Sequence, residues 1–518
     1  MDRRLFISSV ALGSSAIANA APPTTHGVRP GPEISGGAVG TDGPLWSWTA
    51  ADLAKSLRQR RISAREATQS CLLRMQQVNA SVNAVVESLE AEALAAADVA
   101  DRRFANSKSA VLPPLLGIPV TTKINVDLAG HPTTDGVVAF RQSIAKEDHS
   151  SVANLRRGGA IVIGRTNTPA FSFRWFADND LHGQTLNPWD PTVTPGGSSG
   201  GAAAAVAVGI GPIAHGNDIA GSVRYPAYCC GVAGIRPTVG LVPSFNPSSE
   251  QSLPGISAQL MGVQGLLARS IADLRLSLPV LSQRDVRDAS WTPVDRIRSP
   301  LPQRARIAIL SELPGTKTDP SVAAGILVAS KALARQGFVV EEVVPPRFQE
   351  AADLWSPLVL SEIGPGLSGA AEKFGDRRIQ TALKTWLGVT ELVDLPGFSQ
   401  ILGKRHQIRR EWSKFFQTYP IIITPASWRA PFPLDFDQQG TDAFREILRA
   451  QSPSLVIALM GVPGLTVPTG VFDGLTTGVQ VVAEWFREDL CFDVGALIEA
   501  AVTMKTPIDP RATRSARP

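Results

Sequence analysis

Short apolar runs that alternate with helical segments constrain the fold of this chain more than any other feature. Runs of this kind occupy residues 115–120, 159–164, 307–310 and 478–482. Strands buried in a parallel sheet are nearly continuous apolar runs of this length, bounded by turns and separated by helices. The sequence therefore predicts an α/β fold with a mixed, mainly parallel central sheet covered by helices on both faces.

The segments between the apolar runs carry helix signals. Ser63 is followed three residues later by Glu66, which is the spacing of a capping box. We expect helices beginning at Ala50 and after Ser63, and helices over 90–105, 320–336 and 488–501. Residues 344–455 are expected to be helical with several proline breaks, and to line the substrate pocket together with residues 171–179.

The N-terminus has the order of a secretory signal peptide. Arg3 and Arg4 precede an apolar stretch that ends at Ile17, followed by Ala-Asn-Ala at 18–20. Paired arginines before such a stretch are typical of twin-arginine export, so we expect export to the periplasm. A frayed N-terminal helix of a cytoplasmic protein is the alternative. The expected organisation is a signal peptide over 1–20, a flexible leader over 21–44, one large catalytic domain over 45–505 and a loose basic tail over 506–518.

Composition excludes several classes of function. The 50 Lys and Arg are interspersed with 46 Asp and Glu, so no basic patch for nucleic acid is predicted. The four cysteines lack the Cys-x-x-Cys spacing of zinc or redox sites. After the N-terminal stretch, no segment has the roughly 20 uncharged apolar residues that a membrane span needs.

Two clusters of glycine and serine are the most unusual local feature. Residues 194–201 read Thr-Pro-Gly-Gly-Ser-Ser-Gly-Gly, and residues 216–224 read Gly-Asn-Asp-Ile-Ala-Gly-Ser-Val-Arg. Glycine costs about 1 kcal/mol relative to alanine in regular structure, so these positions indicate close backbone approach or unusual dihedral angles. An alanine-rich helix between the clusters can bring the two serine sites together. A simple turn at a helix start and an anion cradle at a helix N-terminus are the alternatives.

Lys123 follows directly on an apolar run in Gly-Ile-Pro-Val-Thr-Thr-Lys at 117–123. A solvated strand end is one interpretation of such a lysine. If it is buried instead, loss of hydration lowers the pKa of the ammonium group and makes a neutral amine available as a base.

These three segments, in this order and spacing, resemble the amidase signature family. The similarity continues through 164–169, 186–190, 230–238, 465–470 and 478–480, and spans residues 45–505. It implies a serine hydrolase that cleaves carboxylic acid amides to an acid plus ammonia or an amine. Ser222 would form the acyl-enzyme, with Ser198, after a cis peptide bond, and Lys123 as the proton relay. It also implies no cofactor or metal, a small-molecule amide as substrate, and a monomer or homodimer.

The family pattern also suggests which residues support the nucleophile. Backbone N–H groups that stabilise the oxyanion are expected at Ile219, Ala220, Gly221 and Ser222. Residues expected to hold the two serine loops together are Ser199, Asp218 and Arg224. The chain departs from its relatives at Ala220, where they usually carry glycine, and at Ile124, where they usually carry aspartate. Alanine would be strained if position 220 required positive φ.

Other functions are weaker interpretations of the sequence. Residues 196–200 match Gly-x-Ser-x-Gly, but the α/β-hydrolase elbow needs a preceding strand, and residues 187–195 contain three prolines. A histidine base would have to be His215 or His406. The glutaminase component of a tRNA-dependent amidotransferase and a catalytically inactive binding protein are further alternatives. Aliphatic, aryl and peptide amides, and esters, all stay open as substrates.

Overall fold

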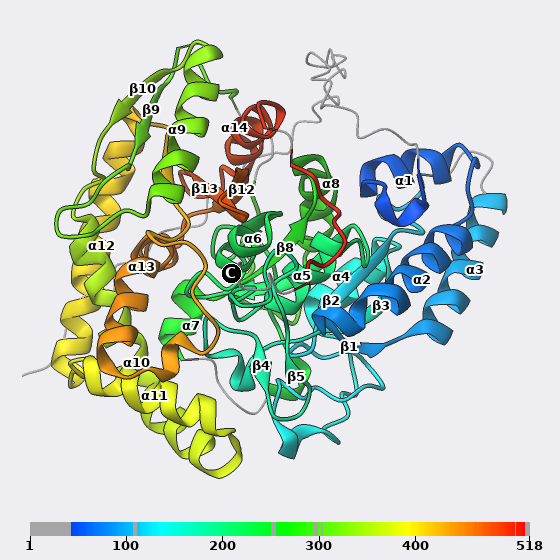
Figure 1. The fold of residues 1–518 in the computed structure, drawn as a ribbon, viewed down its shortest axis with the longest axis horizontal. Helices are drawn as coiled ribbons and strands as arrows, with labels where there is room; N and C mark the ends of the chain where they lie inside the picture. The colour runs from blue at the N-terminus through cyan, green and yellow to red at the C-terminus, as the bar shows by residue number, and fades with distance from the viewer. Residues whose placement is uncertain are drawn as a thin grey trace, which may run out of the picture. The chain divides into compact units, whose positions relative to one another are not determined.

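An eleven-stranded sheet forms the centre of the computed structural model, which describes residues 43–106, 111–249, 255–294, 299–302, 304–502 and 504–512 (Figure 1). The strand order across the sheet is β1-β3-β2-β6-β8-β7-β12-β13-β11-β9-β10. The strands are β1 (Val85–Ser88), β2 (Pro119–Lys123), β3 (Ile161–Thr166), β6 (Ile213–Asp218), β7 (Ala233–Arg236), β8 (Val263–Ala268), β9 (Arg306–Ile309), β10 (Val339–Glu342), β11 (Ile421–Pro425), β12 (Gly464–Phe472) and β13 (Leu475–Ala483). A separate pair is formed by β4 (Asp178–Asn179) and β5 (Gly183–Gln184).

The pairing confirms a mixed sheet and corrects the expectation that it is mainly parallel. Parallel pairs join β3 to β2 and β2 to β6 near one end, and β11 to β9 and β9 to β10 at the other. The six other pairs, including all those between β6 and β11 in the middle, are antiparallel. Strands buried on both faces are continuous apolar runs in either orientation, so the sequence pattern does not reveal direction.

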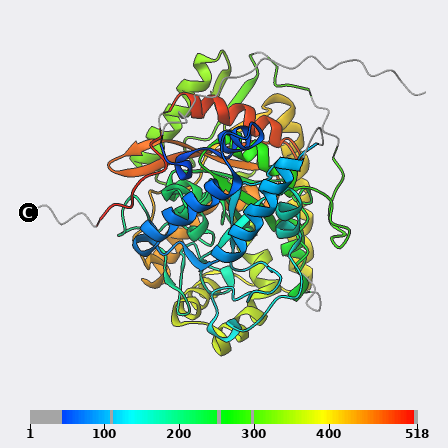
Figure 2. The ribbon, with the colours of Figure 1, turned by 90° about the vertical axis from the view of Figure 1, so that its right-hand side faces the viewer.

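Helices flank the sheet, as predicted. In the first part of the chain they are α1 (Ala50–Arg58), α2 (Ala64–Val82), α3 (Glu90–Asn106), α4 (Ser150–Arg157), α5 (Gly200–Val208), α6 (Arg224–Cys230), α7 (Ile256–Met261) and α8 (Ile271–Leu281). In the second part they are α9 (Pro320–Arg335), α10 (Phe348–Phe374), α11 (Arg377–Val389), α12 (Leu395–Thr418), α13 (Thr441–Met460) and α14 (Glu488–Ala500). Figure 2 shows the blue helices α1 to α3 side by side beneath the red helix α14.

Local signals placed most of these elements correctly. Ser63 and Glu66 form the predicted capping box, with each side chain bonded to the other residue's backbone N–H. The region 344–455 is helical as expected, but α10 continues through Pro357 and Pro365 and is not broken by them. The sequence analysis missed strand β11 within this region, although Ile421 opens a short apolar run there.

Helix α5 carries the first serine loop into the centre of the molecule. All nine of its residues are buried; seven of them are glycine or alanine, and the other two are valine. Small side chains allow the helix to pack closely against β6 and α6, which follow it in the chain. This packing fixes the end of the loop that holds Ser198.

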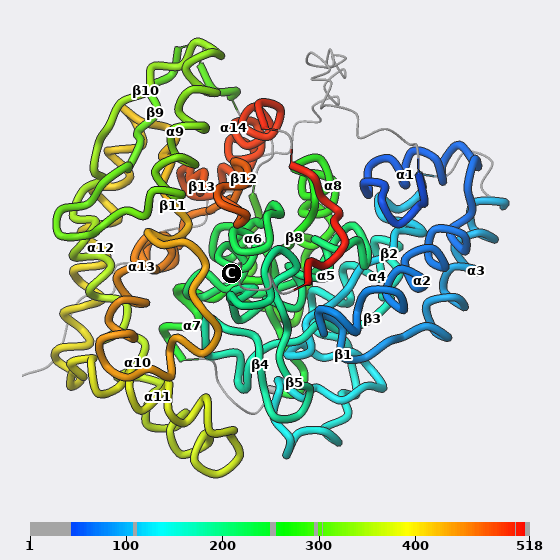
Figure 3. Tube along the Cα trace, viewed as in Figure 1, coloured from blue at the N-terminus to red at the C-terminus, as the bar shows by residue number. Residues whose placement is uncertain are grey.

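Three expectations concern the ends of the chain: the signal peptide, the leader and the loose tail. The predicted signal peptide and nearly all of the leader lie outside the described residues and stay predictions. The expectation of a loose tail is wrong for residues 506–512: the Ile508 N–H donates to the Ala207 carbonyl, and the Arg511 guanidinium lies over the Trp189 ring. Figure 3 shows this segment in red, passing α5, where the Ile508–Ala207 hydrogen bond lies. Within the described segments, every helix is too short or too polar to span a lipid bilayer.

Candidate active site

Lys123, the last residue of β2, is fully buried and faces the first serine loop. Its Nζ donates to Ser198 Oγ at 2.7 Å and to Asn217 Oδ1 at 2.8 Å. Burial lowers the pKa of Lys123 to about 7, against the opposing effect of the carboxyl groups of Asp135 and Asp218. Near neutral pH a large fraction of Lys123 is therefore an uncharged amine in hydrogen-bond contact with a serine hydroxyl.

The two glycine and serine clusters meet, as the sequence predicted. Ser199 N–H donates to the Ser222 carbonyl at 3.1 Å, which joins the loop before α5 to the loop between β6 and α6. The Gly197–Ser198 peptide bond is cis. A side chain on Gly197 would collide with the backbone of Phe176, which explains the need for glycine at that position.

Ser222 lies at the edge of a narrow cavity and is 7% exposed. Within the described part of the chain, no hydrogen bond joins its hydroxyl to that of Ser198. Catalytic hydrogen bonds are often long or incomplete in the absence of substrate and shorten when substrate binds. The structure thus contains the contact between Lys123 and Ser198, and places Ser222 on the loop that is hydrogen-bonded to the loop of Ser198.

Asp218 and Arg224 anchor the second loop, in the supporting position that the sequence suggested. Arg224 binds Asp218 through Nε at 3.0 Å and Nη2 at 2.9 Å, and Arg236 donates to the Asp218 carbonyl at 2.7 Å. Burial alone would raise the pKa of Asp218, but the two guanidinium groups hold that pKa well below its usual range. Asp218 is therefore a permanent anion that fixes the loop. Ser199 Oγ also donates to the Asn217 carbonyl, at 3.4 Å.

One of the four expected oxyanion donors is already engaged. The Gly221 N–H donates to Asp218 Oδ1 at 2.9 Å, so the assignment of Gly221 as a donor to the oxyanion is wrong. The N–H groups of Ile219, Ala220 and Ser222 have no acceptor among the residues that the structure describes. Positive φ falls on Gly221, at 100°, and not on Ala220, so the alanine is unstrained.

Aromatic side chains form the wall of the cavity beside Ser222. It is lined by Phe173 and three tryptophans, Trp175, Trp355 and Trp386. Trp386 stacks on Trp355 with ring centroids 5.6 Å apart, and its centroid lies 4.9 Å from that of Trp175. Two of the segments expected to build the pocket, 171–179 and 344–455, supply these rings. Which side chains converge there was not visible in the sequence.

Two of these tryptophans also hold the loop that carries the free N–H groups. Trp175 Nε1–H donates to the Ala220 carbonyl at 2.9 Å, and Trp355 Nε1–H donates to the Ile219 carbonyl at 3.1 Å. The Trp355 contact orients the peptide group that carries the Ala220 N–H. The Trp175 contact orients the next peptide group, whose Gly221 N–H is bound to Asp218. The pocket wall and the proposed oxyanion hole are one connected structure.

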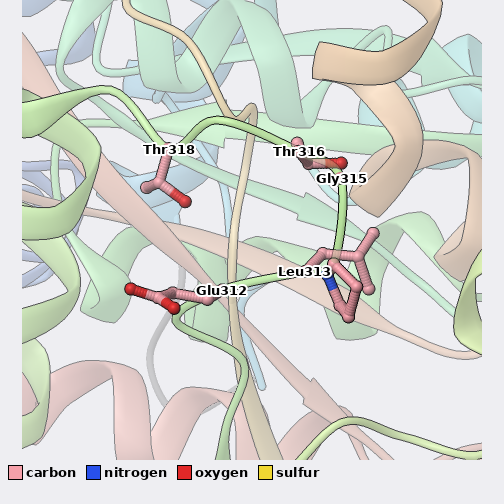
Figure 4. A pocket seen from close by; sticks show the side chains of 6 residues that line it. Glu312, Leu313, Gly315, Thr316 and Thr318 are labelled. Atoms are coloured by element: carbon pink, nitrogen blue, oxygen red, sulfur yellow. The ribbon is translucent and has the colours of Figure 1, made fainter.

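A larger hollow of about 540 Å³ lies at the loop after β9, and none of the residues above contributes to it. Figure 4 shows Glu312 and Thr318 on one side of this hollow and Leu313 on the other. Its lining contains a single carboxyl group and neither serine nor lysine. Ser222, by contrast, lines the smaller cavity.

Comparison with known proteins places this geometry in a family. The family model described as Amidase matches residues 66–492. The chain belongs to the amidase signature family. It is therefore a hydrolase that acts on amides.

Individual relatives of this amidase are named for different amides. It is 42% identical over 460 residues to an indoleacetamide hydrolase of Bradyrhizobium diazoefficiens, covering 88% of this chain and 87% of the relative. It is 30% identical over 470 residues to an acylamidase of Rhodococcus erythropolis, covering 87% of this chain and 95% of the relative. The solved structure of a 6-aminohexanoate cyclic dimer hydrolase with its substrate aligns at a TM-score of 0.76 and 25% identity, covering 89% of this chain and 98% of that one.

The α/β-hydrolase alternative fails on the local structure of this amidase. Residues 185–199, which lead to the glycine-rich loop and α5, contain no strand. His215 is fully buried on β6, where its Nε2 pairs with Gln264 Oε1 at 3.0 Å and not with a serine. The strand-turn-helix geometry of a nucleophile elbow is therefore missing around Ser198.

The contact between Trp175 and Ala220 gives a test of the site. We expect Trp175→Phe to lower kcat of the amidase about tenfold, because the loop with the free N–H groups loses one anchor. Trp412→Phe is the matched control, since Trp412 Nε1–H donates to the Pro346 carbonyl away from the cavity. Each variant loses one buried hydrogen bond, worth about 1 to 3 kcal/mol of stability. Equal effects of the two substitutions on kcat would contradict the role of Trp175.

Proposed function

We propose that this amidase hydrolyses amides through an acyl-enzyme on Ser222, with Ser198 and Lys123 as the proton relay. The observation that carries the proposal is the 2.7 Å contact between the buried Lys123 Nζ and Ser198 Oγ. Serine is a weak nucleophile until an adjacent base takes its proton. A lysine can be that base only when it is uncharged, and burial supplies this condition here.

The proposed reaction passes protons along these three side chains. Lys123 takes the proton of Ser198 while Ser198 takes that of Ser222, and Ser222 Oγ bonds to the amide carbon. The carbonyl oxygen becomes an oxyanion, for which the free N–H groups of Ile219, Ala220 and Ser222 are the candidate donors. One such donor is worth about 3 to 4 kcal/mol in other enzymes. The proton returns through Ser198 to the amide nitrogen as the C–N bond breaks.

Water completes the cycle. After ammonia or an amine leaves, Lys123 is again neutral and activates a water molecule through the same serine. The water attacks the ester carbon, the acid leaves, and the Ser222 hydroxyl is restored. Apart from substrate and water, every group in these reaction steps belongs to the protein, and every proton removed is returned within one turnover.

We further propose that the acyl group of the preferred substrate is flat and aromatic. Phe173, Trp175, Trp355 and Trp386 line the cavity beside Ser222, and a planar ring stacks favourably on such side chains. The cavity has a volume of about 20 Å³, so the side chains of its wall must move apart to admit a ring. The name of the relative from Bradyrhizobium diazoefficiens supports a primary amide of an arylacetic acid. Such a substrate releases ammonia.

Covalent labelling tests the nucleophile. We expect a fluorophosphonate probe to label the purified amidase, and Ser222→Ala to abolish both labelling and amide hydrolysis. Ser330→Ala is the control, since Ser330 lies on α9 and its hydroxyl donates to the Ile326 carbonyl of the same helix. It should keep the label. Label that persists in Ser222→Ala, located by mass spectrometry on another residue, would contradict the assignment.

A substrate panel tests the aromatic pocket. Ammonia release from indole-3-acetamide and phenylacetamide is expected to exceed that from acetamide and L-glutamine by at least about 100-fold in kcat/KM, because stacking and apolar burial of a ring contribute about 3 kcal/mol. Trp386→Leu should reduce this preference about tenfold. Trp412→Leu, which removes a buried indole outside the cavity, should leave the preference unchanged. Equal rates across the panel would contradict an aromatic acyl site.

A further inference from the structure

A chain of hydrogen-bonded polar side chains leads away from Lys123 through Asn217. Asn217, which accepts from Lys123, donates through Nδ2 to Asn125 Oδ1 at 3.0 Å. Asn125 Nδ2 donates to Ser172 Oγ at 3.0 Å, and Ser172 Oγ donates to Asp135 Oδ1 at 2.5 Å. The catalytic base is thus connected, through three neutral side chains, to a carboxyl group that the sequence analysis did not select.

The backbone around Asp135 is tightly fixed. Asp135 has a positive φ of 46°, and its carbonyl accepts the Phe171 N–H at 3.0 Å. Phe171 and Ser172 also have positive φ, at 56° and 53°. Residues other than glycine adopt this conformation at a cost of order 1 kcal/mol or more each, and it persists only where surrounding contacts enforce it. The fold therefore tolerates conformational strain at the place where the Asp135 carboxylate and the Ser172 hydroxyl meet.

Asp135 and Asp218, the two carboxyl groups near Lys123, differ in their ionic partners. Asp218 is neutralised by Arg224 and Arg236. In the described part of the chain, no arginine, histidine or second lysine forms an ion pair with Asp135. A further titratable neighbour of Lys123 is His215, which is kept uncharged because burial lowers its pKa to about 3. Asp135 is thus the acidic group near Lys123 whose charge is not committed to an arginine.

We propose that Asp135 is a positioning residue for the Lys123 base: through Ser172, Asn125 and Asn217 it orients the amine toward Ser198, and its negative charge sets the pH at which that amine becomes active. This inference rests on the proposed function of Lys123 as base. Ser172 also lines the cavity beside Ser222, so the same network links the substrate site to the base.

The electrostatics of the pair agree with this arrangement. Asp135 is half-buried. Removal of its carboxyl group from water raises the pKa to about 7, against the lowering effects of the Ser172 hydrogen bond and of Lys123. Asp135 in turn raises the pKa of Lys123, whose burial lowers it. Two groups that interact this strongly titrate as a pair. Removing the carboxylate charge should therefore leave Lys123 easier to deprotonate.

Asp135→Asn is the decisive variant, because an asparagine Oδ1 can still accept from Ser172 while the charge is lost. We expect the acid limb of the kcat/KM profile to move to lower pH by about half a unit to one unit, with the plateau rate at high pH changed less than about threefold. Asp135→Ala, which also removes the acceptor, should shift the limb and lower the plateau about tenfold. Asp135→Glu, which restores the charge, should return the limb toward the wild-type pH.

The control is Asp442→Asn, which removes a carboxylate that is 98% exposed on α13 and should leave the profile unchanged. Lys123→Met is expected to remove activity, and it tests the role of Lys123 as base separately from the role of Asp135. Suppose that Lys123→Met is inactive, but that the acid limb of Asp135→Asn lies within about 0.2 pH unit of the wild-type limb. This result would overturn the role of Asp135 and leave that of Lys123 intact. Activity retained in Lys123→Met would overturn the triad, and the inference with it. Thermal unfolding of each variant shows whether a loss of rate reflects loss of fold.

Discussion

The mechanism that we propose for this amidase depends on one physical constraint, the removal of the Lys123 amine from water. A buried ammonium group without full solvation costs several kcal/mol, so the group loses its proton near neutral pH. The central sheet creates this environment, because Lys123 ends a strand that lies between two parallel neighbours. In the proposed mechanism, this burial lets Lys123 act as a base beside Ser198.

Arg224 joins the loop that holds Ser222 to the C-terminal part of the fold. Arg224 binds Asp218 on the second serine loop and also donates to Gln480 Oε1 at 2.8 Å and to the Ser454 carbonyl at 2.9 Å. Gln480 lies on β13 and Ser454 on α13, more than 200 residues away in the sequence. The loop that holds Ser222 is therefore fixed by residues from the end of the chain, and an intact C-terminal region is part of the active-site structure.

The sequence predicted those features that local chemistry determines, such as the capping box at Ser63 and the meeting of the glycine-rich loops. It did not predict the antiparallel middle of the sheet, since strand direction leaves no trace in a fully buried run. The tryptophan wall and Asp135 were missed because their roles arise from tertiary contacts: Trp386 and Ser172 are far apart in the chain yet line one cavity. Gly221 was misassigned because the Asp218 carboxylate takes its N–H.

The protonation state of Lys123 is the most direct test of this account. Lysine labelled with carbon-13 at Cε gives NMR signals that report the charge of each amine, and the spectrum of Lys123→Met identifies the signal of Lys123. We expect this signal to titrate near pH 7, while exposed lysines titrate near their usual value of about 10.4. A Lys123 signal that stays in the charged position up to pH 10 would contradict a neutral lysine base.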